Sequence, residues 1–146
     1  MPGATYLGED GERRPVVMAA YRAWLLRAVA AVVEEHHDAK GITWPREVAP
    51  FHAHLVAIGA SRDPRVSETC ERLHDAALRG GREVLYDDRD ESPGVKFADA
   101  ELLGMPTILT VSPRSLAQDA VEVTDRATGE RTLVPLAEVE AGLAGG

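Results

Sequence analysis

The sequence predicts an α/β domain: a mixed sheet of about five strands flanked by helices and preceded by an N-terminal helix. Three observations lead to this prediction. Strand-like and helical patterns alternate from residue 51 to the end of the chain. A chain of 146 residues is about one domain long and can bury a core without disulfides or metal. Apolar residues make up 45% and charged residues 27%, a globular balance that argues against disorder over the whole chain.

The N-terminal part predicts one helix and little other regular structure. Apolar residues recur at three- and four-residue spacing over residues 21–40, which is typical of one helical face. Gly41 is a suitable stop signal, and a proline-containing linker follows it. We therefore divide the chain into two parts, residues 1–41 and residues 42–146.

The remaining elements follow in chain order. Short strands are expected at residues 4–7 and 15–18, and the strands of the sheet at 51–58, 83–86, 105–111, 120–124 and 131–134. Helices are expected at residues 65–79, 97–103 and 135–143.

Local signals support these boundaries. The strand at 51–58 ends at Gly59, and the helix at 65–79 ends at Gly80. Gly129 lies between the last two strands, where a β-hairpin turn needs a residue with positive φ. The charged segment 87–94 predicts a loop.

The acidic balance excludes binding to nucleic acid through a broad basic surface. The chain has 16 Lys and Arg against 24 Asp and Glu, a formal net charge of −8 and a pI near 5.1. Five basic and six acidic residues give residues 1–41 a charge of −1, whereas eleven and eighteen give residues 42–146 a charge of −7. Because phosphate contacts come from clustered cations, any RNA binding must depend on a few placed groups.

Other chemistry finds little support in the sequence. The single cysteine, Cys70, cannot form an internal disulfide, and no signal peptide or membrane-length apolar segment is visible, so we expect a cytoplasmic protein with no membrane contact. Five histidines invite a search for zinc, but zinc sites combine such pairs with cysteine or carboxylate ligands at characteristic spacing. We expect no metal, no cofactor and no catalytic residue.

A longer pattern resembles one family. It begins with GITWP at residues 41–45 and continues with DDR at 87–89, PGVKFAD at 93–99 and ELLGMP at 101–106. These strings, in this order and spacing, resemble the C-terminal anticodon-binding domain of bacterial prolyl-tRNA synthetases. The resemblance implies the class II aminoacyl-tRNA synthetase anticodon-binding fold for residues 42–146 and a role in translation as a tRNA-binding domain.

The resemblance extends into residues 1–41, which look like a strand and helix left from the class II catalytic domain. Met18, Tyr21 and Arg27 match the conserved motif 3 of that domain. Three glycines of the motif are replaced, by Ala19, Arg22 and Trp24. These replacements predict a helix that begins near Ala19, in place of a turn that approaches a nucleotide closely. With motifs 1 and 2 absent as well, the resemblance implies a stand-alone, truncated paralogue that does not aminoacylate tRNA.

The candidate tRNA-binding residues are Asp87, Asp88, Arg89, Lys96 and Glu101. Arg and Lys can contact guanine edges and phosphates, and carboxylates can accept hydrogen bonds from base amines. Proline anticodons contain two guanines, which suits such a set. Pro93 and Gly94 are expected to form a tight turn that presents Lys96. On the residues alone, the favoured interpretation is that Asp87 and Asp88 cap the next turn and pair with Arg89.

Three functions stay open at this stage. The first is recognition of proline tRNA without aminoacylation. The second is a protein-interaction or homodimerisation role for the helix at residues 21–40, because Trp24, Leu25 and Leu26 would lack the body that they pack against in the family. The third is a fold recruited for specialised metabolism, for which the sequence offers no nucleophile and base.

Overall fold

A five-stranded mixed sheet forms the centre of the computed structural model, which describes residues 3–145. The strand order is β4 (Val84–Asp87), β3 (Ala53–Ala57), β5 (Thr107–Val111), β6 (Ala120–Asp125) and β7 (Arg131–Pro135). β3 pairs in parallel with β4 and β5, whereas β6 pairs antiparallel with β5 and β7. This mixed sheet confirms the predicted fold class.

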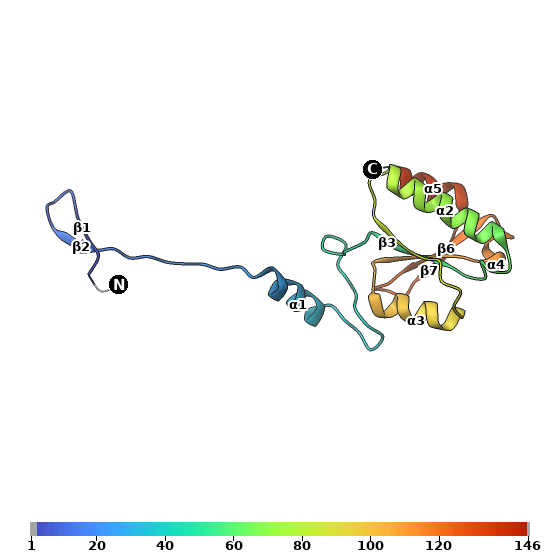
Figure 1. Cartoon of the computed structure of the whole chain (residues 1–146), viewed down its shortest axis with the longest axis horizontal. Coiled ribbons are helices and arrows are strands. Elements are labelled where there is room, and N and C mark those ends of the chain that lie inside the picture. Colours follow the sequence, from blue (N-terminus) through green and yellow to red (C-terminus); the bar gives the residue numbers. More distant parts are fainter. Residues whose placement is uncertain (1–2, 146) are drawn as a thin grey trace.

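Helices cover both faces of the sheet (Figure 1). α2 (Pro64–Arg79) and α5 (Leu136–Ala144) lie side by side on one face, and α3 (Pro93–Leu103) lies on the other. A short helix, α4 (Pro113–Leu116), follows β5 and was not predicted. Among the described residues, no helix has the length and apolar character needed to cross a bilayer.

The two faces of the sheet differ in chemistry. The face toward α2 and α5 carries the main core, which includes Leu55, Val66, Leu73, Leu109 and Val121. The face toward α3 has a small apolar cluster, Val56, Ala100 and Ile108 with Ile58 beside it. Buried polar residues share this second face, by strand alternation or by their place on α3: His54, Asp87, Lys96 and Thr110. The α3 face is therefore the polar side of the sheet.

Helix α3 begins earlier than predicted. The Ser92 side chain accepts a hydrogen bond from the Val95 amide, and Pro93 occupies the first helical position, where proline needs no hydrogen-bond partner for its nitrogen. The predicted loop through Gly94 was therefore wrong. Pro93 and Gly94 form the first turn of the helix and do not make a tight turn that presents Lys96.

The N-terminal part of the chain extends away from the sheet as an arm, which we define as residues 3–35 (Figure 1). It consists of an antiparallel ribbon of β1 (Thr5–Leu7) and β2 (Arg13–Pro15), an extended segment, and α1 (Leu25–Glu35). The strand predicted at residues 15–18 was misplaced, because β2 begins two residues earlier and ends three residues earlier. No residue of α1 is buried.

Helix α1 is shorter at both ends than the predicted helix at residues 21–40, and the start near Ala19 was wrong. Trp24 has extended backbone angles and provides no side-chain cap. The residues before it are exposed, so no packing stabilises a further helical turn there. At the other end the Asp38 amide donates to the Gly41 carbonyl (2.9 Å), which closes a turn in place of helix.

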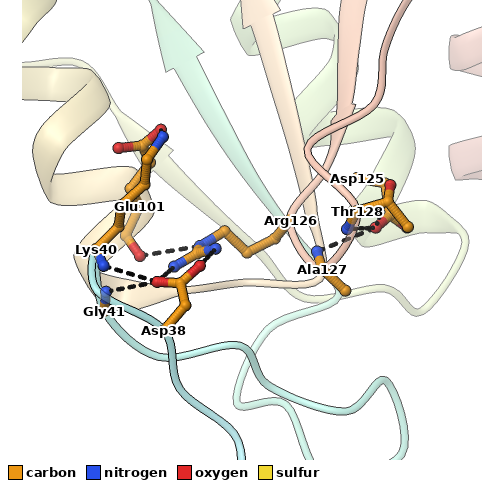
Figure 2. A network of polar contacts seen from close by, with 8 residues as sticks. All are labelled: Asp38, Lys40, Gly41, Glu101, Asp125, Arg126, Ala127 and Thr128. Atoms are coloured by element: carbon orange, nitrogen blue, oxygen red, sulfur yellow. Dashed lines mark hydrogen bonds and ion pairs between the residues drawn. The ribbon is translucent and has the colours of Figure 1, made fainter.

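The turn after α1 is held to the domain by an ion pair (Figure 2). Arg126 Nη1 and Nη2 donate to Asp38 Oδ2 (2.7 Å) and Oδ1 (2.9 Å), and Arg126 Nε donates to the Glu101 carbonyl (3.0 Å). The Asp38 carboxylate also accepts hydrogen bonds from the Lys40 (2.7 Å) and Gly41 (3.0 Å) amides. The Arg126 guanidinium lowers the pKa of Asp38 well below its ordinary value.

A capped turn positions Arg126. Asp125, at the end of β6, accepts hydrogen bonds from the Ala127 and Thr128 amides (both 3.0 Å), and the Arg126 amide donates to the Pro106 carbonyl (3.0 Å). These contacts explain why the guanidinium is buried, with its side chain 5% exposed.

Two glycines let the linker and the end of α3 approach closely. A Cβ on Gly41 would lie 2.5 Å from Leu102 Cα, and one on Gly104 would lie 1.8 Å from the Ile42 carbonyl oxygen. Backbone hydrogen bonds join the same segments, from Ile42 to Leu102 (3.2 Å) and from Trp44 to Gly104 (3.1 Å). The division at residue 41 therefore falls inside a segment that is docked on the domain, and it stays a prediction.

Candidate nucleic-acid interface

A crevice of about 640 Å³ opens at the carboxyl ends of β3, β4 and β5. We call it the strand-end crevice. It is lined by residues 57–62 after β3, residues 88–93 after β4, Lys96 of α3 and Pro113 after β5. In open sheets with parallel strands, ligands bind in crevices at this end. Three of the five candidate residues, Asp88, Arg89 and Lys96, line it. Asp87 lies behind them, with its buried carboxylate against Arg89 and Lys96.

The Arg89 guanidinium is fixed at this crevice by two carboxylates. Its Nε donates to Asp87 Oδ1 (2.9 Å), and its Nη2 donates to Asp87 Oδ2 (2.8 Å) and to Asp99 Oδ2 (2.7 Å). The Asp87 side chain is 4% exposed, whereas that of Arg89 is 51% exposed. The guanidinium lowers the pKa of Asp87, and the two carboxylates raise the pKa of Arg89. The arrangement holds a charged, half-exposed fork in one orientation.

Lys96 lines the crevice from below and is almost completely buried. Its side chain is 2% exposed, and its Nζ donates to the carbonyls of Ala57 (2.8 Å) and Asp87 (3.2 Å). Nζ also lies 3.7 Å from Asp87 Oδ1. Lys96 is a predicted RNA contact, but in the structure its ammonium is bound by the protein itself.

Asp88 and Glu101 lie in different places. Asp88 is exposed at the crevice beside Arg89. Glu101 lies near the other end of α3, about 12 Å along the helix from Pro93, and forms an ion pair with Lys40 (2.8 Å). Glu101 is therefore not brought together with the other four candidates.

Sequence reasoning missed Asp99 as a site residue. Asp99 follows Lys96 by three positions on α3, so both side chains leave the same helical face. The predicted helix began only at residue 97, so the spacing carried no signal. With the helix start at Pro93, the pair would have been visible.

A second cavity of about 410 Å³ adjoins Arg89 and Asp99 and extends between β4 and the end of α3. His54 lies in its wall, 2% exposed, and its Nδ1 has no hydrogen-bond partner among the described residues. Burial lowers the pKa of His54, which favours the neutral ring. This ring is a buried polar group beside the crevice. The sequence presented it only as one of five histidines that could bind zinc.

Two further kinds of site, a metal site and a reactive cysteine, have no matching geometry in the described part of the chain. No cluster of three or more His, Cys, Asp or Glu residues is arranged to hold a metal ion within residues 3–145. Cys70 is fully buried, and burial raises the pKa of its thiol to about 12.

Known proteins resemble the chain over most of its length. The family model described as "Anticodon binding domain" matches residues 48–145. The proline–tRNA ligase of Geobacter sulfurreducens is 46% identical over 134 residues, which are 92% of this chain and 23% of that protein. That of Bacillus subtilis is 43% identical over 138 residues, 94% of this chain and 24% of that protein. The chain thus spans about a quarter of the length of these relatives.

Solved structures agree on the fold. Prolyl-tRNA synthetase from Cryptosporidium parvum, complexed with L-proline and AMP, matches with a TM-score of 0.74 at 23% identity and covers 95% of this chain and 30% of its own. The Giardia lamblia prolyl-tRNA synthetase, in complex with prolyl-adenylate, matches with a TM-score of 0.71 at 24% identity, over 93% of this chain and 29% of its own. From the family match, the relatives and the shared fold, the chain belongs to the anticodon binding domain family, in the form that prolyl-tRNA synthetases carry.

Proposed function

We propose that this chain recognises the anticodon loop of proline tRNA at the strand-end crevice. The observation that carries the proposal is Arg89, which two carboxylates hold half exposed at the crevice of a domain from the anticodon binding family. The relatives named as proline–tRNA ligases support proline tRNA as the substrate.

The local charge favours contacts with base edges over contacts with phosphates. Arg89 is opposed by Asp87 and Asp99, so the three side chains together carry no positive charge. Asp87 and Asp99 take the hydrogen bonds of Nε and Nη2, whereas Nη1 has no partner among the described residues. Nη1 can therefore donate to O6 or N7 of guanine, the base that arginine contacts most often. The exposed Asp88 carboxylate can accept from a base amine. A site of this kind gives specificity with only a shallow dependence on salt.

The test compares proline tRNA with the same tRNA in which both anticodon guanines are replaced by cytidine. Binding to the chain is measured by fluorescence anisotropy at several salt concentrations. We expect the altered tRNA to bind about 5- to 150-fold more weakly, because one guanine contact is worth about 1–3 kcal/mol. Equal affinity for the two RNAs, or no binding of either, would contradict the proposal.

We also propose that this polypeptide, by itself, neither activates proline nor charges tRNA, and that it works in the cytoplasm with tRNA as its partner. Arg22 and Trp24 stand where motif 3 has glycines, and the segment that contains them is extended and exposed. The expected result of an ATP–pyrophosphate exchange assay with proline is no activity above a buffer control. Proline-dependent exchange would overturn this part of the proposal.

A second candidate function is homodimerisation through the arm. Large apolar side chains of the arm are highly exposed: Val17 by 89%, Met18 by 86%, Tyr21 by 94%, Leu25 by 80% and Leu26 by 85%. Exposed apolar side chains gathered in this way normally mark a surface that another protein covers. We expect sedimentation equilibrium to reveal a concentration-dependent dimer that L25D/L26D abolishes, while the exposed-surface control R27Q does not. A monomer at all concentrations would exclude this candidate.

A further inference from the structure

We propose that Lys96 is a positioning residue of the strand-end crevice: it holds the Arg89 guanidinium in place and does not itself touch the RNA. The role in RNA recognition rests on the proposed function. The role in placing Arg89 stands on the contacts of Lys96 alone.

Lys96 anchors α3 to the sheet. Lys96 and Ala100 are the buried residues of this helix, whereas Val95, Leu102 and Leu103 are between 42% and 57% exposed. A helix on a sheet normally attaches through an apolar stripe. In α3 the larger of the two buried side chains is the lysine, not an apolar residue. The position of the helix on the sheet therefore depends on what the Lys96 ammonium binds.

The ammonium binds the ends of two strands. Ala57 and Asp87 are the last residues of β3 and β4, and their carbonyls both accept a hydrogen bond from Lys96 Nζ (2.8 and 3.2 Å). A buried carbonyl at the end of a strand needs a donor from elsewhere. One ammonium supplies both donors and thereby sets the separation of the two strand ends that form the crevice.

Two routes lead from Lys96 to Arg89. The first passes through Asp87, whose Oδ1 lies 3.7 Å from Lys96 Nζ and accepts from Arg89 Nε. The second passes through Asp99, which lies on the same face of α3 and accepts from Arg89 Nη2. A change at Lys96 therefore disturbs both carboxylates that orient the guanidinium.

Charge strengthens the first route. The Asp87 carboxylate is almost fully buried and faces two cations, Arg89 and Lys96. A buried charge that loses one partner is strongly unfavourable unless its other contacts change. Without the lysine, Arg89 is the remaining cation in contact with this carboxylate among the described residues, and we expect the guanidinium to shift.

The main test uses K96M, which keeps most of the side-chain length and removes the ammonium. K40M is the matched control, because Lys40 is exposed and belongs to a separate ion pair with Glu101. The first readout is the NMR signal of the Arg89 Nε–H group in the free protein. We expect K96M to shift this signal and speed its exchange with solvent, and K40M to leave it unchanged.

The second readout is tRNA binding as a function of salt. If Lys96 positions Arg89, K96M loses about tenfold in preference for the guanine anticodon, while the slope of log Kd against log salt stays at the wild-type value. If Lys96 contacts a phosphate, the slope falls by about one and the preference is kept. The second result, or an unchanged Arg89 signal in K96M, would overturn the proposal.

A measurement on the wild-type chain covers the case in which K96M does not fold. Lys40 and Lys96 are the two lysines of the sequence. Reductive methylation followed by mass spectrometry should modify Lys40 and leave Lys96 unmodified, with or without tRNA. Methylation of Lys96 in the free protein that tRNA blocks would show an RNA contact and contradict the proposal. If wild-type protein shows no anticodon preference, the proposed function fails, and the Arg89 signal still decides whether Lys96 positions Arg89.

Discussion

Arg126 and Asp38 form a two-point ion pair across 88 positions of sequence, with Nη1–Oδ2 and Nη2–Oδ1 distances of 2.7 and 2.9 Å. The guanidinium is buried and the carboxylate is partly exposed. The pair joins the turn after α1 to the hairpin between β6 and β7. It therefore determines how the N-terminal arm leaves the anticodon-binding domain.

The first prediction concerns this ion pair and pH. The pKa of Asp38 is lowered in the folded protein, so its contribution to linker docking is present above the unfolded pKa near 4 and is lost as pH falls below it. At pH 7, D38N should speed hydrogen exchange of the Ile42 and Trp44 amides. As pH falls below about 4, the difference from wild type should shrink.

The control for this prediction is D10N, because Asp10 pairs with Arg14 in the arm and has no contact with the linker. It should leave the exchange of the Ile42 and Trp44 amides unchanged. Identical exchange in D38N and wild type at pH 7 would show that the ion pair does not hold the linker.

The second prediction separates backbone strain from close packing. Gly104 and Gly81 both have left-handed backbone, with φ of 70° and 69°. A Cβ at Gly81 meets no atom within 4 Å, whereas one at Gly104 would lie 1.8 Å from the Ile42 oxygen. G81A should cost about 1 kcal/mol from strain alone. G104A should lower the free energy of unfolding, measured in urea, by clearly more than G81A does. It should also expose Trp44, which would shift the tryptophan fluorescence to longer wavelength. Equal costs for the two variants would contradict the close docking of the linker.

The third prediction concerns Cys70. Because the thiol is fully buried and burial raises its pKa to about 12, it should not react with a thiol reagent such as DTNB in native protein at pH 8. Reaction should appear with the unfolding transition in urea. Fast labelling without denaturant would show that α2 does not close over the core as described.

Much of the sheet and the two helices on its apolar face could be predicted from sequence. Both α2 and β5 pack on a continuous core, and this packing requires the apolar spacing of α2 and the apolar run of β5. The glycine after α2 marks the end of the helix. The start of α3 was missed, because Ser92 and Pro93 follow a charged segment and were interpreted as part of a loop. The length of α1 was overestimated, because a helical pattern does not form a full helix without a surface to pack on.

The candidate site could be predicted only in part. The strings around Arg89 and Lys96 indicated residues that the fold does bring together, since both lie at the strand-end crevice. Whether a lysine points outward or is buried depends on the carbonyls that it meets. Here these belong to Ala57 and Asp87, which lie 39 and 9 positions away and approach Lys96 only in the folded sheet. The separation of Glu101 from the crevice likewise follows from the direction of α3, which spacing alone does not give.

The fourth prediction is the most direct test of the central claim, that the fixed Arg89 guanidinium reads the anticodon. The measurement is the ratio of affinities for proline tRNA and its cytidine-substituted anticodon variant, in R89K and in the control R62K, with folding checked by circular dichroism. Arg62 also lines the crevice but forms no ion pair with a described carboxylate. We expect R89K to lose about 1–3 kcal/mol of the preference and R62K to keep it. Lysine is a point charge on a flexible stem, so Asp87 and Asp99 cannot hold it in the fixed, planar orientation of the guanidinium. A folded R89K that still discriminates between the two RNAs as wild type does would contradict the account.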